Sequence, residues 1–122
     1  MNTAIIMLGS NTDAKKNMAL TVMKLIECFE ITNRSLQINT EAVGAQFSVN
    51  FNNVALKILS TKALDETISI FKQIEHELGR KTDSKLTGII PMDIDLIFWN
   101  EVQVHEDYNR FEYVKTCVNE IK

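Results

Sequence analysis

Two aspartates inside an otherwise apolar segment, residues 91–99, constrain this chain more than any other feature. The segment is rich in strand-forming residues and is bounded by Pro91 and Asn100, which predicts a buried strand. Side chains alternate between the two faces of a strand, so Asp93 and Asp95 point to the same side, with Cα atoms roughly 6.5–7 Å apart. Two carboxylates at this separation repel each other unless a positive group lies between them. A hard divalent cation such as Mg²⁺ meets this need and commonly accompanies phosphates. The alternative is a sheet face open to water, where acids need no ligand.

The overall composition narrows the class of protein. A hydrophobic content of 45% in 122 residues suits one packed domain, residues 1–122. The formal net charge is −3 and no basic stripe is present, so nucleic acid is not expected as a partner. No apolar run reaches the length of a membrane span. Cys28 and Cys117 lack metal-ligand spacing and no signal-peptide pattern is found, which indicates a cytoplasmic location. The oligomeric state is left open.

Apolar residues recur with two different periods along the chain, and their order predicts the fold. A spacing of two is typical of half-buried strands, and spacings of three and four are typical of helices packed on one side. The expected strands cover residues 3–8, 36–40, 51–59, 91–99 and 102–104. One expected helix covers 14–29, and a second runs from a cap at Ser60 or Thr61 to Gly79. A weaker helical pattern is found in 111–121. This order predicts an α+β, ferredoxin-like (split βαβ) fold, in which an antiparallel sheet carries helices on one face. The other face would be free for a ligand or a partner.

Several common motifs are missing from the sequence. It contains neither the phosphate-binding P-loop nor the glycine-rich dinucleotide fingerprint, so any nucleotide is bound in another way. His76 and His105 stand in no motif with a serine or cysteine, which argues against an activated nucleophile. The polar segment 80–90 predicts a mobile loop.

Four short motifs occur in a characteristic order. They are Gly9-Ser10-Asn11, Phe51-Asn52-Asn53, the helix end from Ile74-Glu75 to Gly79-Arg80, and Asp93-Ile94-Asp95 followed by Asn100-Glu101. Together, over roughly residues 4–104, they resemble the 6-hydroxymethyl-7,8-dihydropterin pyrophosphokinase family of folate biosynthesis. The resemblance implies transfer of pyrophosphate from ATP to 6-hydroxymethyl-7,8-dihydropterin, with release of AMP. It also implies two Mg²⁺ ions held by Asp93 and Asp95, with Arg80 facing the phosphates as a third catalytic residue.

Further positions match the binding sites of that family. They are Thr40, Val43, Phe51 and Asn53 for the pterin, and Glu75, Arg80 and Arg110 for the nucleotide. An aromatic face can stack on a flat heterocycle, and an amide can pair with its ring donors and acceptors. From the residues alone, Phe51 fits core packing as well as stacking. Glu75 equally fits a solvated helix acid, and Arg80 a simple exposed arginine.

The chain also departs from the family pattern. Ile90 stands where an arginine is expected to meet phosphate, Thr82 where a second loop arginine is common, and Thr87 where a tryptophan is usual. The prolines expected after Thr40 are replaced, and a Pro-His element after the aspartate strand is missing; His105 has the wrong spacing to substitute for it. The loss of one charged contact at a transition state costs roughly 10²–10³ in rate. Three interpretations follow: a divergent, attenuated pyrophosphokinase; a non-catalytic pterin- or nucleotide-binding protein on the same fold; and an interaction module that uses its free sheet face.

Overall fold

The computed structural model describes residues 1–41, 50–80 and 88–122. The elements in these residues are β1 (Asn2–Ser10), α1 (Ala14–Ile26), β2 (Glu30–Arg34), β3 (Ile38–Thr40), β4 (Phe51–Ser60), α2 (Leu64–Glu77), β5 (Asp93–Trp99), β6 (Val102–Gln103), α4 (Asp107–Arg110) and α5 (Glu112–Ile121). No helix among them is long and apolar enough to cross a membrane.

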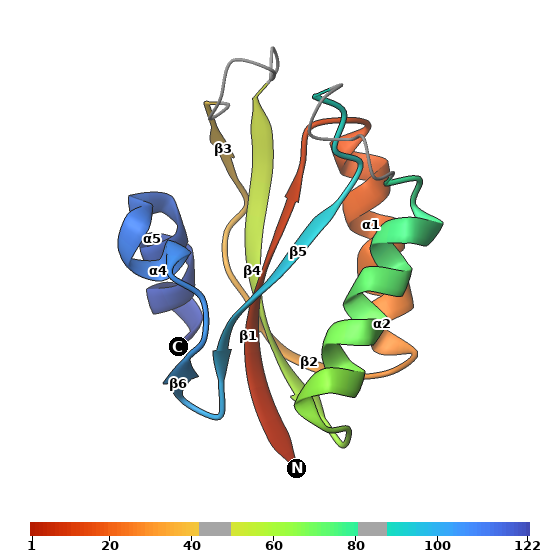
Figure 1. Ribbon diagram of the computed structural model, residues 1–122. Helices are drawn as coiled ribbons and strands as arrows, with labels where there is room; N and C mark the ends of the chain where they lie inside the picture. Colours follow the sequence, from red (N-terminus) through yellow and green to blue (C-terminus); the bar gives the residue numbers. More distant parts are fainter. Residues whose placement is uncertain (42–49, 81–87) are drawn as a thin grey trace.

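One antiparallel sheet forms the centre of the molecule, with strand order β2-β4-β1-β5-β6 and β3 paired to β4 (Figure 1). The two long strands β1 and β4 pair along their whole length, from Asn2 opposite Ser60 to Ser10 opposite Asn52. Helices α1 and α2 cover one face, where Ile6, Leu8 and Phe71 belong to a closed apolar core. This arrangement confirms the predicted α+β, ferredoxin-like fold.

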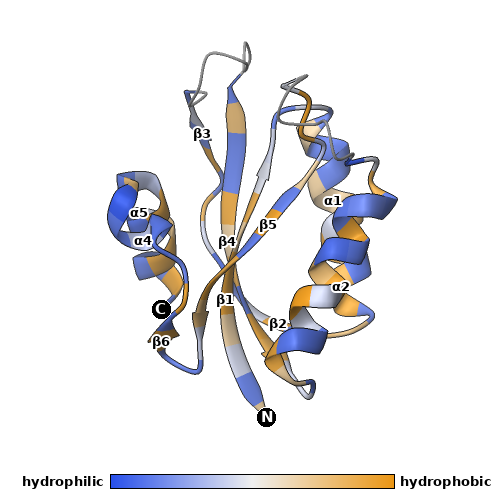
Figure 2. Ribbon diagram, viewed as in Figure 1, coloured by the Kyte–Doolittle hydropathy of each residue, from blue (hydrophilic) through white to orange (hydrophobic). Residues whose placement is uncertain are grey.

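The sequence had suggested that the second face of the sheet is free. In the structure, part of this face is covered. Helix α5 packs across it. Its buried residues form one apolar cluster with residues of the sheet: Val114, Cys117, Val118 and Ile121 from α5, and Ile5, Met7, Ala55, Ile97 and Phe98 from the strands. Figure 2 shows the apolar side of α5 turned toward the sheet. The cause lies in β1, whose side chains are apolar on both faces and therefore need cover on both.

Several element boundaries differ from the predicted ones. The strand expected at 36–40 is β3, at Ile38–Thr40, and the preceding strand β2, at Glu30–Arg34, was not expected. Between them the Ser35 hydroxyl accepts the Ala55 N–H at 2.8 Å. Helix α2 begins after Ala63, which makes no side-chain cap; the Ser60 hydroxyl instead lies 3.0 Å from the Thr67 hydroxyl. Helix α1 ends at Ile26, three residues early, and Phe29 joins the core from the turn that follows.

Candidate active site

A cavity of about 310 Å³ lies beside the sheet face that α5 partly covers. Its walls come from both sheet and helices, and they include Gly9, Thr40, Phe51, Asn53, Arg80, Ile90, Asp93, Asp95, Asp107, Phe111 and Tyr113. Pockets for small ligands typically start at about this volume. Six of the candidate site residues expected from the sequence therefore line one space: Thr40, Phe51, Asn53, Arg80, Asp93 and Asp95.

Asp93 and Asp95 lie on the cavity side of β5, opposite Gly9 and Met7 of β1. Their side chains are 35% and 32% exposed. Burial raises the pKa of Asp95 to about 8, and the neighbouring negative charge of Asp93 adds to the effect. Ionisation of both carboxylates at neutral pH is therefore unfavourable, because their negative charges repel each other. A bound cation would remove this repulsion.

Arg80 follows α2 and reaches across the edge of β5. One of its terminal nitrogens, Nη1, lies 2.5 Å from Asp93 Oδ1 and 3.1 Å from Glu75 Oε2. The same Glu75 oxygen accepts the backbone N–H of Ile94 at 2.7 Å. Burial raises the pKa of Glu75, and the bonds from Ile94 and Arg80 oppose this shift. Glu75 is only 4% exposed and does not line the cavity, so its observed contacts fasten α2 and Arg80 to the strand that carries the aspartates.

Three of the residues expected at the pterin, Thr40, Phe51 and Asn53, meet where β4 begins. Thr40 pairs with Phe51, and the Asn53 side-chain amide donates to the Thr40 hydroxyl at 2.8 Å. Gly9 lies opposite Asn53 in the sheet, and a Cβ atom on Gly9 would stand 3.1 Å from Asn53 Oδ1. A side chain at residue 9 would press on that amide, which explains why the first motif begins with glycine.

The asparagine of the first motif holds the segment that leads into β5. Asn11 Oδ1 accepts the Ile90 N–H at 2.8 Å, and the Asn11 backbone N–H donates to the Ile90 carbonyl at 3.1 Å. The Asn11 side-chain nitrogen, Nδ2, donates to the Gly88 carbonyl at 2.7 Å. Ile90 is 3% exposed and lines the cavity together with the two aspartates.

Some of the expected residues lie outside the described part of the chain, and Arg110 is not among the residues that line the cavity. Val43, Thr82 and Thr87, with most of the predicted loop 80–90, lie outside the described residues. Arg110 is exposed on α4, and its guanidinium lies 5.0 Å from the centre of the Phe111 ring rather than in the cavity.

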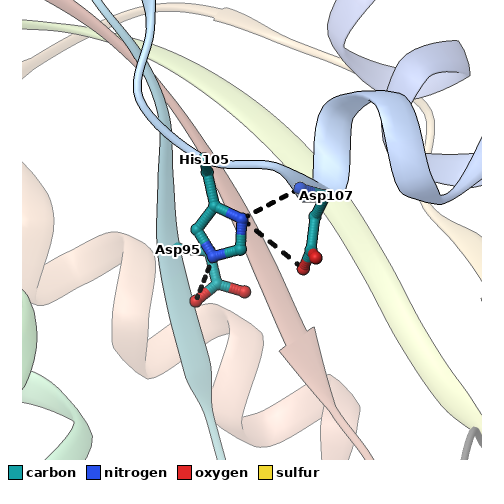
Figure 3. A group of neighbouring side chains, drawn as sticks. All are labelled: Asp95, His105 and Asp107. Atoms are coloured by element: carbon teal, nitrogen blue, oxygen red, sulfur yellow. Dashed lines mark hydrogen bonds and ion pairs between the residues drawn. The ribbon is translucent and has the colours of Figure 1, made fainter.

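Four residues in or beside the cavity were not identified from the sequence as site residues: His105, Asp107, Phe111 and Tyr113. Phe111 and Tyr113 line the cavity from the start of α5, and burial raises the pKa of Tyr113 to about 12. His105 and Asp107 lie beside Asp95: His105 Nε2 is 3.9 Å from Asp95 Oδ1, and Nδ1 is 3.7 Å from Asp107 Oδ2 (Figure 3). The only signal for this group in the sequence is the spacing of two between histidine and aspartate.

Comparison with known families gives a consistent result. A sequence model described as 7,8-dihydro-6-hydroxymethylpterin-pyrophosphokinase (HPPK) matches residues 5–122. The chain is 31% identical over 102 residues to a 2-amino-4-hydroxy-6-hydroxymethyldihydropteridine pyrophosphokinase of Aquifex aeolicus, covering 83% of this chain and 63% of the relative. It is 27% identical over 105 residues to a folate synthesis bifunctional protein of Arabidopsis thaliana, covering 84% of this chain and 22% of that protein.

Solved structures show the same fold. The structure of Plasmodium falciparum HPPK-DHPS with pteroate matches with a TM-score of 0.54 and 13% identity, over 99% of this chain and 35% of that one. At this identity the match establishes the fold alone. The chain spans less than two thirds of the curated relatives described above.

Proposed function

The chain belongs to the 7,8-dihydro-6-hydroxymethylpterin-pyrophosphokinase family, and we propose that it transfers pyrophosphate from ATP to 6-hydroxymethyl-7,8-dihydropterin and releases AMP. One observation carries the proposal. A single cavity contains the paired acids Asp93 and Asp95, the cation Arg80, and the group formed by Thr40, Phe51 and Asn53. A polar, charged end and an aromatic, amide-bearing end are what a phosphate donor and a flat heterocyclic acceptor need when they react side by side.

The aromatic end is assigned to the pterin. Phe51 offers a ring for stacking, and Phe111 lines the cavity as a second aromatic side chain. The hydrogen bond from Asn53 to Thr40 fixes the orientation of the amide, so that its carbonyl oxygen is directed for accepting a ring N–H. A preset amide loses little freedom when the ligand binds, and this favours one orientation of the ring.

The acidic end is assigned to the ATP phosphates and two Mg²⁺ ions. The donor set fits, because Asp93 and Asp95 supply hard carboxylate oxygens from adjacent positions on one strand face. When bound, Mg²⁺ would neutralise phosphate charge and help to align the reacting groups. In the absence of a cation the guanidinium of Arg80 serves as the counter-charge of Asp93. Once a cation binds Asp93, we expect Arg80 to turn to a phosphate oxygen.

The reaction places simple demands on the protein. The hydroxymethyl oxygen forms a bond to the β-phosphorus, the bond from that phosphorus to the α–β bridging oxygen breaks, and AMP leaves with the electron pair while the hydroxyl proton passes to solvent. Such a transfer depends on alignment and charge stabilisation rather than on a covalent intermediate with the protein. Phe51 and Asn53 would hold the acceptor, and Arg80 would stabilise charge on the donor. With Ile90 in place of a further arginine, we expect a slow enzyme.

The decisive test is a single-turnover measurement of AMP formed from ATP, Mg²⁺ and the hydroxymethyl-dihydropterin. AMP and pyrophosphorylated pterin should appear in equal amounts. Asp93→Asn and Asp95→Asn should each lower the rate about 10²–10³-fold while the far-UV circular dichroism spectrum stays unchanged. Asp65→Asn, which removes an exposed acid from α2, is the matched control and should keep the wild-type rate.

A binding measurement distinguishes the enzyme from a non-catalytic pterin-binding protein. If no AMP forms but the pterin raises the melting temperature, the chain is a pterin-binding protein on the same fold. If neither pterin nor Mg-ATP shifts the melting temperature, both assignments of the cavity are wrong.

A further inference from the structure

We propose that Asp95 and His105, with Asp107 orienting the imidazole, form a mixed nitrogen–oxygen site that binds a transition-metal dication such as Mn²⁺ in preference to Mg²⁺. This inference deepens the proposed function, on which it rests through the shared residue Asp95. It changes the expected chemistry at one of the two cation positions, because an imidazole nitrogen would join the carboxylate oxygens.

The geometry of the three side chains suits such a site. Asp95, His105 and Asp107 each offer a ligand atom, and these atoms lie within 4.8 Å of one another. His105 Nε2 points at Asp95 Oδ1, 3.9 Å away (Figure 3). Metal–nitrogen and metal–oxygen bonds of about 2.1 Å set two ligands of one ion about 3.0–3.4 Å apart in octahedral or tetrahedral geometry. The two residues therefore need to approach by less than about 1 Å, which the turn between β6 and α4 can supply.

The second nitrogen of His105, Nδ1, faces both the backbone and the carboxylate of Asp107. Nδ1 lies 3.7 Å from Asp107 Oδ2 and accepts the Asp107 N–H at 3.1 Å. When a cation takes the lone pair of Nε2, the ring proton moves to Nδ1 and can be donated to the Asp107 carboxylate. A carboxylate behind the imidazole is the common support of a metal-bound histidine. The Asp107 amide is the first of helix α4 and needs no partner within the helix.

The charge distribution directs a cation to this side of Asp95. Asp93 is already paired with Arg80. Among the described residues, neither Asp95 nor Asp107 forms an ion pair with a lysine or arginine; their only such partner is His105. A cation can therefore join these two carboxylates without displacing any lysine or arginine that the structure describes.

The ligand set determines which metal is preferred. Mg²⁺ favours an all-oxygen shell, whereas imidazole nitrogen strengthens binding of Mn²⁺, Co²⁺ and Zn²⁺. A site with one nitrogen and one or two carboxylates should therefore discriminate against Mg²⁺, although Mg²⁺ is the ion expected from the two aspartates alone.

The test uses Mn²⁺ alone, without nucleotide or pterin. Pulsed electron paramagnetic resonance of the Mn²⁺-loaded wild type should show modulation from an imidazole ¹⁴N, and Mn²⁺ should bind at least about tenfold more tightly than Mg²⁺. His105→Gln should abolish the modulation and lower Mn²⁺ affinity about tenfold or more, with little change for Mg²⁺. Asp107→Asn should weaken Mn²⁺ binding by about tenfold through loss of the support behind the ring.

His76→Gln is the matched control, because His76 is exposed on α2 and is the other histidine of the chain. This variant should keep both the modulation and the affinity, which assigns the nitrogen to His105 even if His105→Gln fails to fold. A wild type without ¹⁴N modulation, or an unchanged metal preference in folded His105→Gln, would overturn the inference. Since no turnover is measured, a failure to form AMP would count against the proposed function and leave this result standing.

Discussion

Replacement of Asp95 by asparagine should make the metal-free protein more stable at alkaline pH while it removes a metal ligand. The pKa of Asp95 rises from 3.8 to about 8 in the folded chain, because burial and the charge of Asp93 disfavour the ionised form. Between these two values the folded state holds a proton that the unfolded state releases. The free energy of unfolding of the wild type therefore falls as the pH rises from about 4 to about 8 and becomes flat above that range.

The size of the effect follows from the shift and the exposure. Each pKa unit corresponds to about 1.4 kcal/mol, so a shift of about four units sets an upper bound on the order of 5–6 kcal/mol. The carboxylate is 32% exposed to solvent. Screening by water makes the actual effect smaller than this bound. We expect the free energy of unfolding of the wild type to fall by about 2 kcal/mol between pH 5 and pH 8. An asparagine side chain cannot ionise, so Asp95→Asn should lack this slope and exceed the wild type by about 2 kcal/mol at pH 8.

Urea denaturation from pH 5 to pH 9 in the presence of a chelator measures the slope. Asp65→Asn provides the control, because it removes an exposed carboxylate by the same substitution and should parallel the wild type. Addition of Mg²⁺ at pH 8 should stabilise the wild type and not Asp95→Asn. The same pH slope in Asp95→Asn and wild type would refute the electrostatic reasoning about this site.

Two further substitutions test the surroundings of the aspartates. Glu75→Gln should lower the free energy of unfolding by about 1–3 kcal/mol, because Arg80 loses a buried charged partner. The control is Glu77→Gln, which breaks only a surface pair with Lys24 and should cost less than about 1 kcal/mol. Urea denaturation measures both losses, and equal losses would contradict this role of Glu75. Ile90→Arg should lower stability without ligand but raise the rate of AMP formation, since a guanidinium from residue 90 would enter the cavity beside the phosphates. Ile90→Met keeps the apolar character, and a rate increase in both variants would exclude a charge effect.

The regular elements were predictable where one period dominated. The spacing of two in β4 and the three–four spacing in α2 both gave the correct element, and Gly79 ends the helix region with a φ of 98°. The position of α5 was not predictable from its own pattern. The signal was in its partner, because Ile5 and Met7 alternate with equally apolar residues and require cover on both faces of β1.

The site was predictable only in part, for a similar reason. Asp93 and Asp95 are adjacent on one strand face, so their shared direction follows from local geometry. The contact of Arg80 with Asp93 and that of His105 with Asp95 depend on how α2 and the turn after β6 reach the strand. Loop geometry of this kind is set by tertiary packing and has no periodic signal in the sequence.

The edge strands of the sheet have a consequence for solubility. At Ile94 the backbone N–H of β5 points away from β1, and unpaired strand amides of this kind can template intermolecular pairing. The Glu75 carboxylate accepts a hydrogen bond from that amide, and the charged Arg80 lies beside the carboxylate. At the opposite edge, β2 is short and mostly exposed, with Glu30 and Arg34 at its ends. A variant that frees Arg80 by removing the carboxylate and any other acceptor at residue 75, such as Glu75→Ala, would therefore also open a strand edge and carry a risk of aggregation.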